Sequence, residues 1–272
     1  MICDCDCFIL SMIKIKSVED IKKMKSGGII LSRILSLLAK KCVAGANTED
    51  LDKLAQEEMT KAGGSPSFLH YQIHSSDPPY PSAICISIND EVVHAPAIPN
   101  RVIKDGDVVK IDIGLWYENM ATDMACTILV GNTSEMAREL SIETRRSLEI
   151  ALQTVKDGSW VHDIGKAIQG YLEPKGFGII RDLVGHGVGY EIHEDPQIPH
   201  FHDRRQPPIK LKTGMCIAIE PMISLGDWRV KQKDDGWTIV TMDGSLTAHW
   251  EVTIAVTKDG YELITPWPEI KQ

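Results

Sequence analysis

Four carboxylic acids of this 272-residue chain lie inside segments whose composition is typical of buried strands. Asp112 and Asp123 stand in the stretch DVVKIDIGLWYENMATDMACTILV, Glu220 stands in CIAIEPM, and Glu251 stands in AHWEVTIAV. An ionised carboxylate loses its hydration on burial, so it needs a cation or several hydrogen-bond donors as compensation. Because these runs carry no matching set of Arg or Lys, bound divalent cations are the predicted partners, and two dications would balance the four acids.

Histidines add to this predicted site. His186 lies among three glycines in GHGVG, a backbone open to close approach, and His193 follows seven residues later. Two metal ions roughly 3.5 to 4 Å apart lower the pKa of a water and stabilise the oxygens of a hydrolytic transition state. Oxygen-rich ligation with one imidazole suits Mn, Fe or Co at least as well as Zn. The residues therefore predict hydrolysis and leave the identity of the metal open.

A hairpin must carry the first two acids, because two runs rich in β-branched residues flank the polar turn Tyr117-Glu118-Asn119. The strand expected before it turns at Asn89-Asp90 and leads to His94. The loop over 65–82 is too rich in proline for regular structure and is a candidate pocket wall. The other expected elements are helices over 17–43, over 48–63 with Thr48 as its N-cap, over 134–156 and over 162–173, and strands over 83–88 and from 177 onward.

An internal repeat accounts for this order of elements. KDGDVVKID, which ends at Asp112, aligns with KTGMCIAIE, which ends at Glu220, and each places a glycine six residues before the acid. We expect a single catalytic domain over 14–272 made of two related halves, about 14–131 and 132–265, although a chance similarity is the alternative. Residues 1–13, with Cys3, Cys5 and Cys7, are expected to be a short disordered tail, although cysteines that alternate with acids could also trap a soft metal.

Charge and hydropathy exclude several classes of function. A net charge of −9 and a pI near 5.5 argue against a nucleic-acid partner, which requires a basic surface. The most apolar run, 29–39, contains Arg33 and is too short to span a bilayer of roughly 30 Å, so no membrane association is expected. The first residues are acidic where an export signal is basic, which favours the cytoplasm.

Taken in order, these residues resemble the type I methionine aminopeptidases over about residues 14–265. CISIN before the first histidine, GHGVG around the second and IEPM around the third acid are part of the likeness. The resemblance implies an α+β fold, the pseudo-two-fold "pita-bread" fold, with a central antiparallel sheet and helices packed on one side. The residues that carry it are His94, Asp112, Asp123, His186, His193, Glu220 and Glu251.

By this resemblance five residues hold two divalent metal ions, which could be Co, Mn, Fe or Zn. Asp123 and Glu251 bridge the two ions, Asp112 completes the first site, and His186 and Glu220 complete the second. Glu220 also assists proton transfer from the attacking water.

The family further implies that His193 polarises the scissile carbonyl and that His94 contacts the peptide nitrogen. Tyr80, Cys85 and Trp237 match positions that line its methionine side-chain pocket, although ordinary core packing is the alternative for all three, and most of all for Cys85.

The chain departs from the family at three places. Ala95-Pro96-Ala97 follows His94 where Gly-Ile-Pro is usual, Val252 replaces a histidine after the last glutamate, and the loop over 72–79 is unlike the usual short one. No ligand is lost by these changes, so they bear on substrate range rather than on chemistry.

The expected function is removal of the N-terminal methionine from peptides and nascent chains, at the ribosome and by a monomer, with a small second residue preferred. One alternative is a proline-specific peptidase of the same fold. Another is a module of that fold that binds peptides without cleaving them, which intact metal ligands disfavour.

Overall fold

The computed structural model describes residues 13–72 and 78–270. Most of the expected tail, with its three cysteines, and most of the unusual loop over 72–79 lie outside the described residues. Ile13, the last residue assigned to the tail, is described and lies buried in the hydrophobic core.

Within the described part of the chain, nine strands form one antiparallel sheet, and its two longest strands are the predicted hairpin. The main order across the sheet is β1 (Ser65–Pro66), β4 (Val108–Tyr117), β5 (Met120–Leu129), β14 (Glu251–Val256), β9 (Cys216–Ile219), β7 (Gly185–Gly187) and β8 (Glu194–Ile198). β2 (Ile84–Ile88) pairs with β4 outside this order, and β15 (Tyr261–Leu263) pairs with β14.

Two smaller sheets complete the β-structure of the described residues. One has the order β13 (Thr247–His249), β10 (Met222–Ser224) and β6 (Gly178–Ile179). The other has the order β11 (Val230–Gln232), β12 (Ile239–Thr241) and β3 (Glu91–Val93).

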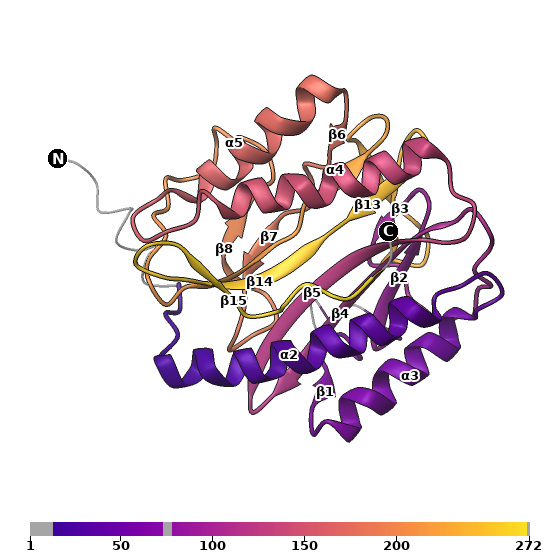
Figure 1. Ribbon diagram of the computed structural model, residues 1–272, viewed down its shortest axis with the longest axis horizontal. Helices are drawn as coiled ribbons and strands as arrows, with labels where there is room; N and C mark the ends of the chain where they lie inside the picture. Colours follow the sequence, from indigo (N-terminus) through magenta and orange to yellow (C-terminus); the bar gives the residue numbers. More distant parts are fainter. Residues whose placement is uncertain (1–12, 73–77, 271–272) are drawn as a thin grey trace.

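The helices cover one face of the large sheet (Figure 1). These helices are α2 (Val18–Lys41), α3 (Thr48–Lys61), α4 (Glu135–Leu152) and α5 (Val161–Leu172), and a short 3-10 turn, η1 (Glu173–Lys175), follows α5. α2 packs on β4 and β5, and α4 packs on β5 and on strands of the small sheets. α3 lies beside α2, and α5 lies beside α4.

Side-chain capping explains where α2 and α4 begin. The Ser17 hydroxyl accepts from the backbone N–H of Asp20, and the Ser134 hydroxyl accepts from that of Ala137. The prediction that Thr48 caps α3 was wrong, because Asn47 is the N-cap. The Thr48 hydroxyl instead donates to the carbonyl of Ala97, so a tertiary contact has taken over the side chain.

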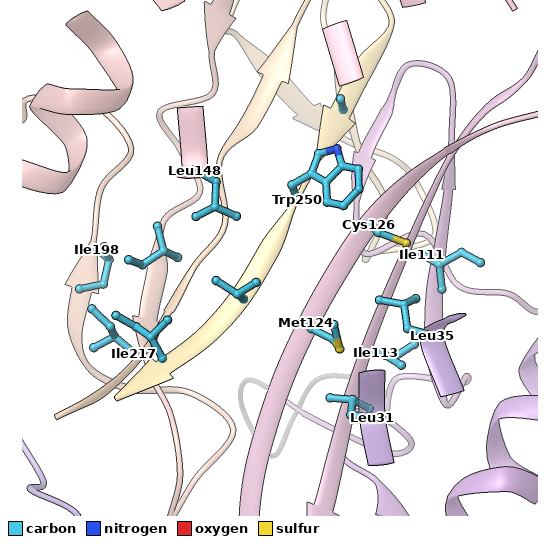
Figure 2. Packing of buried hydrophobic residues seen from close by; sticks show 14 of the residues in the cluster. Leu31, Leu35, Ile111, Ile113, Met124, Cys126, Leu148, Ile198, Ile217 and Trp250 are labelled. Carbon is cyan, nitrogen blue, oxygen red and sulfur yellow. The ribbon is translucent and has the colours of Figure 1, made fainter. Parts of the chain in front are cut away.

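Side-chain alternation sends the apolar residues of the central strands toward the helices. Figure 2 shows these residues of β4 and β5 beside two leucines of α2. Successive side chains of a strand point to opposite faces. Asp112 lies between Ile111 and Ile113, and therefore leaves the sheet on the face away from α2. The side chains that share the core here are Leu31, Leu35, Ile111, Ile113, Met124 and Cys126.

The two turns singled out by the repeat have the same backbone geometry. Gly106 has φ +89° and Gly214 has φ +90°, a region that only glycine adopts readily. The N–H of Gly106 donates to the carbonyl of Val130, and the N–H of Gly214 donates to that of Val256. The first turn thus leads into β4, which carries Asp112, and the second leads into β9, which Glu220 directly follows. The residue boundaries of the two halves stay a prediction.

Across residues 13–72 and 78–270, none of the helices combines the length and the apolar character that crossing a bilayer would require.

Candidate metal centre and active site

Three of the four acids meet because their strands are neighbours in the sheet. Ala125 of β5 lies opposite Asp112 of β4 on one side and opposite Glu251 of β14 on the other. Asp123 lies two residues from Ala125 on the same strand and therefore on the same face. The small side chain of Ala125 leaves the space between the carboxylates open.

Glu220 and His186 reach the same place from the second half of the sheet. Glu220 directly follows β9, whose Ile219 pairs with Val252, and this places Glu220 beside Glu251. The Nε2 atom of His186 lies 3.4 Å from Oε1 of Glu220 and 3.9 Å from Oδ2 of Asp123. Val252, one of the departures noted above, is fully buried in the core.

Three groups of side chains in the described residues bring their ligand atoms within 4.8 Å of one another. Asp123 and Glu251 each belong to two of these groups. The groups are Asp112, Asp123 and Glu251; His186, Glu220 and Glu251; and Asp123, His186 and His193.

The electrostatics of this cluster favour a bound cation. Burial raises the pKa of Asp112 to about 7 and raises those of Asp123, Glu220 and Glu251 well above the ordinary carboxyl range, with the neighbouring carboxylates adding to the rise for these three. Each acid also has one buried oxygen that finds no hydrogen-bond partner within the described part of the chain. Unpaired buried oxygens are costly, and hard divalent ions are the partners that satisfy them. The donor set therefore fits a divalent metal centre.

The tautomer of His186 suits a metal ligand. Its Nδ1 lies 2.9 Å from the carbonyl oxygen of Gly187, and a carbonyl only accepts, so Nδ1 carries the proton. Nε2 then presents a lone pair to Glu220 and Asp123. Burial, and next the neighbouring His193, lowers the pKa of His186 to about 3, which keeps the ring neutral.

All ten residues predicted from the sequence line one cavity of about 630 Å³. Its wall also holds Phe68, Tyr71, Val93 and Met222. The residues brought together are Tyr80, Cys85, His94, Asp112, Asp123, His186, His193, Glu220, Trp237 and Glu251.

The three candidate pocket residues form a contiguous wall. The Tyr80 hydroxyl donates to Sγ of Cys85 at 3.1 Å, and the rings of Tyr80 and Trp237 meet edge to face at 5.1 Å. All three side chains are buried, and this part of the cavity is apolar. It can hold an unbranched apolar side chain beside the acids.

The two accessory histidines each lie next to the end of a strand, His94 after β3 and His193 before β8. His94 directly follows β3 at φ +59°, an uncommon conformation outside glycine that clusters at functional sites. His193 directly precedes β8, and its ring lies 4.5 Å from that of His186. Its Nδ1 lies 2.8 Å from the hydroxyl of Tyr71.

Sequence reasoning missed three polar neighbours of the cluster. Nε2 of the buried His200 accepts from the backbone N–H of Glu220, and Nε2 of the buried His249 lies 3.7 Å from Oε2 of Glu220. His249 could have been found, because it stands two residues before Glu251 and so shares its face. Tyr71 lies in an irregular loop and His200 in an irregular segment, and neither position carries a periodic signal.

The sequence profile of the family described as "Metallopeptidase family M24" matches residues 22–258. The chain belongs to metallopeptidase family M24. It is 41% identical over 255 residues to the methionine aminopeptidase of Clostridium perfringens. This alignment covers 93% of this chain and 99% of the relative.

Two solved structures share the fold of this chain. The crystal structure of methionine aminopeptidase from Thermotoga maritima matches with a TM-score of 0.88 and 43% identity, and covers 95% of this chain and all of that one. The prolidase from Pyrococcus furiosus matches with a TM-score of 0.73 and 23% identity, and covers 97% of this chain but 68% of that one. The second likeness shows the fold alone. Together they confirm the predicted α+β pita-bread fold.

Proposed function

We propose that this M24 metallopeptidase removes the N-terminal methionine from peptides and nascent proteins, with a preference for a small second residue. The observation that carries the proposal is that five candidate metal-binding side chains and an apolar wall line the same cavity. Near full-length similarity to methionine aminopeptidases supports the choice of methionine over proline-specific cleavage.

The proposed metal centre uses Asp112, Asp123, His186, Glu220 and Glu251 to hold two divalent ions. When bound, the ions supply a water of lowered pKa and a positive charge for the oxygen that becomes negative in the transition state. The orphaned oxygens of the four acids and the free Nε2 of His186 support this ligand set. The number of ions and their identity are part of this proposal.

The remaining steps belong to the side chains. A carboxylate oxygen of Glu220 takes the proton of the attacking water and passes it toward the leaving amine. A ring N–H of His193 donates to the scissile carbonyl oxygen, where negative charge develops. His94 contacts the peptide nitrogen and orients the bond that breaks.

The apolar wall selects the first side chain. Tyr80, Cys85 and Trp237 offer ring faces and a soft sulfur, which suit a flexible thioether. A wall that takes the first side chain beside the acids would place the first peptide bond next to the metal centre, so we expect exopeptidase cleavage.

The proposal extends to a monomer that works in the cytoplasm on chains emerging from the ribosome. Sedimentation velocity tests the monomer, and co-sedimentation with ribosomes tests the encounter.

One assay tests the function. Purified protein loaded in turn with Co, Mn, Fe or Zn is given a Met-Ala-Ser peptide and an Ala-Pro peptide. Release of methionine from the first peptide alone is the expected result. Cleavage of the second alone would establish a proline-specific enzyme, and two bound metal equivalents without any cleavage would establish a binding module.

A further inference from the structure

The base of the unusual loop is a small paired structure that delivers two tyrosines to the cavity. The N–H of His70 donates to the carbonyl of Tyr80, and the N–H of Tyr80 donates to the carbonyl of Tyr71. The N–H of Tyr71 also donates to the carbonyl of Phe68. Tyr80 faces Cys85, whereas the side chain of Tyr71 faces His193. The two of these hydrogen bonds that involve Tyr71 hold its backbone in place.

Tyr71 and His193 contact each other in two ways. The hydroxyl lies 2.8 Å from Nδ1, and the two rings meet edge to face at 5.1 Å. Burial raises the pKa of the half-buried Tyr71, with the charge of Glu191 adding to it, so the phenol keeps its proton. It is therefore able to donate.

The neighbouring histidines have partners of opposite chemistry. A neutral imidazole carries one N–H and one lone pair, and the partner of one nitrogen decides which nitrogen holds the proton. Nδ1 of His186 meets a carbonyl oxygen, which can only accept. Nδ1 of His193 meets a hydroxyl, which can donate. The two rings, 4.5 Å apart, can thus hold opposite tautomers.

The acid cluster decides the direction of the bond to Tyr71. Since Nδ1 of His193 is engaged by Tyr71, Nε2 is the nitrogen left for Asp123 and His186, whose ligand atoms lie within 4.8 Å of a His193 ring nitrogen. Nε2 of His186 can direct its lone pair at these acids because a bound cation is proposed between them. No cation is proposed for His193, so a lone pair on its Nε2 would be repelled by the Asp123 carboxylate, whereas an N–H would be attracted. The favoured arrangement has the Tyr71 O–H donating to Nδ1 and the proton of His193 on Nε2.

We propose that Tyr71 is a positioning residue that sets the Nε2–H tautomer of His193, so that this ring donates to the scissile carbonyl instead of binding a metal. The inference rests on the proposed function for the role of the donated bond. It assigns a specific task to a residue that directly precedes the loop over 72–79.

The tautomer is tested directly by long-range ¹H–¹⁵N spectra of histidine-labelled protein, both metal-free and loaded with Zn²⁺. The His193 signals are identified by their loss in His193→Gln. The expected result is Nε2–H in the native chain and a loss of this preference in Tyr71→Phe, which keeps the ring contact. A native Nδ1–H tautomer, or an unchanged tautomer in Tyr71→Phe, would overturn the proposal. The measurement needs no turnover, so failure of the proposed function leaves it intact.

Kinetics of methionine release provide a second test. Tyr71→Phe is expected to lower kcat about 10-fold, the low end for loss of a group that orients another, with KM changed less than about twofold. In the His193→Ala background the same substitution should have almost no effect, because residues that act through one another are not additive. An equal loss in both backgrounds contradicts the proposal. Tyr261→Phe on β15, remote from the cavity, is the matched control and should be neutral.

Discussion

The Nζ atom of Lys16 lies 2.6 Å from Oε2 of Glu194, and the two side chains are only 1% and 3% exposed. Glu194 is the first residue of β8 and follows His193 directly. Its other oxygen accepts from the N–H groups of Tyr190 and Glu191. This buried ion pair therefore connects the segment before α2 to the loop that carries His193.

Breaking this pair should cost far more than breaking an exposed one of equal length. Lys16→Met leaves a buried carboxylate without its cation, and we expect the free energy of unfolding to fall by ~3–5 kcal/mol. Lys25→Met removes an ion pair with Glu262 that is also 2.6 Å long but 41% and 46% exposed, and should cost ~1 kcal/mol or less. Urea unfolding of both variants makes the comparison, and equal losses would show that burial does not matter here.

Glu91 holds the strand that leads to His94 through three donors. Its carboxylate lies 2.6 Å from Arg101 and 2.8 Å from Lys233, and it accepts from the N–H of Ile88. Burial by itself would raise the pKa of Glu91, but the two cations and the N–H group outweigh it and hold the pKa below its ordinary value.

The contribution of Glu91 to stability should therefore depend on pH. With a lowered folded-state pKa, the unfolded chain binds more protons, so the stabilisation is complete above the ordinary carboxyl pKa of ~4.3 and is lost as the pH falls through the folded value. Glu91→Gln should lower the free energy of unfolding by ~1.5–3 kcal/mol at pH 7 and by progressively less below pH ~4.3. A difference from the native chain that stays constant between pH 7 and 3.5 would contradict this assignment.

We expect Asp123 to be essential for metal binding and to lower the stability of the metal-free protein. Asp123→Asn should reduce the metal content below two equivalents and abolish turnover, because a neutral amide in a bridging position weakens both sites. The same change removes one buried charge from a cluster of four, so the metal-free variant should melt at a higher temperature than the metal-free native chain. Metal analysis and melting with and without chelator test both effects. The exposed Asp234, changed to Asn, is the control and should alter neither.

The pocket predicts a pattern of substrate preference. Norleucine has the shape of methionine and should be accepted, and a change of one methylene or branch in such a pocket costs only ~1–3 kcal/mol. Lysine should be rejected much more strongly, because its charge would lose hydration against Tyr80, Cys85 and Trp237. The measurement is kcat/KM for peptides that begin with Met, norleucine, Leu or Lys before a common Ala-Ser tail. Similar values for Met and Lys would refute the pocket and leave the metal chemistry standing.

Several features of the site were predictable because their signals are local. A carboxylate inside a β-branched run, such as Asp112 or Glu251, is conspicuous in sequence because burial of an unpaired charge is costly wherever the chain goes. The glycines at 106 and 214 mark turns that need positive φ. The alternation of each strand then assigns its acid to the face away from the helices.

The sequence by itself thus determined the four long helices, the central hairpin, the face that carries the acids and the class of chemistry. It did not predict β1, which lies in a segment expected to have no regular structure. Tertiary structure alone decided which distant groups meet: Lys16 with Glu194, Tyr71 with His193, and Thr48 with Ala97 rather than with its own helix. These contacts join segments between 49 and 178 residues apart. Periodicity reports which face a side chain leaves, but the partner on that face is set by how sheets, helices and irregular loops pack together.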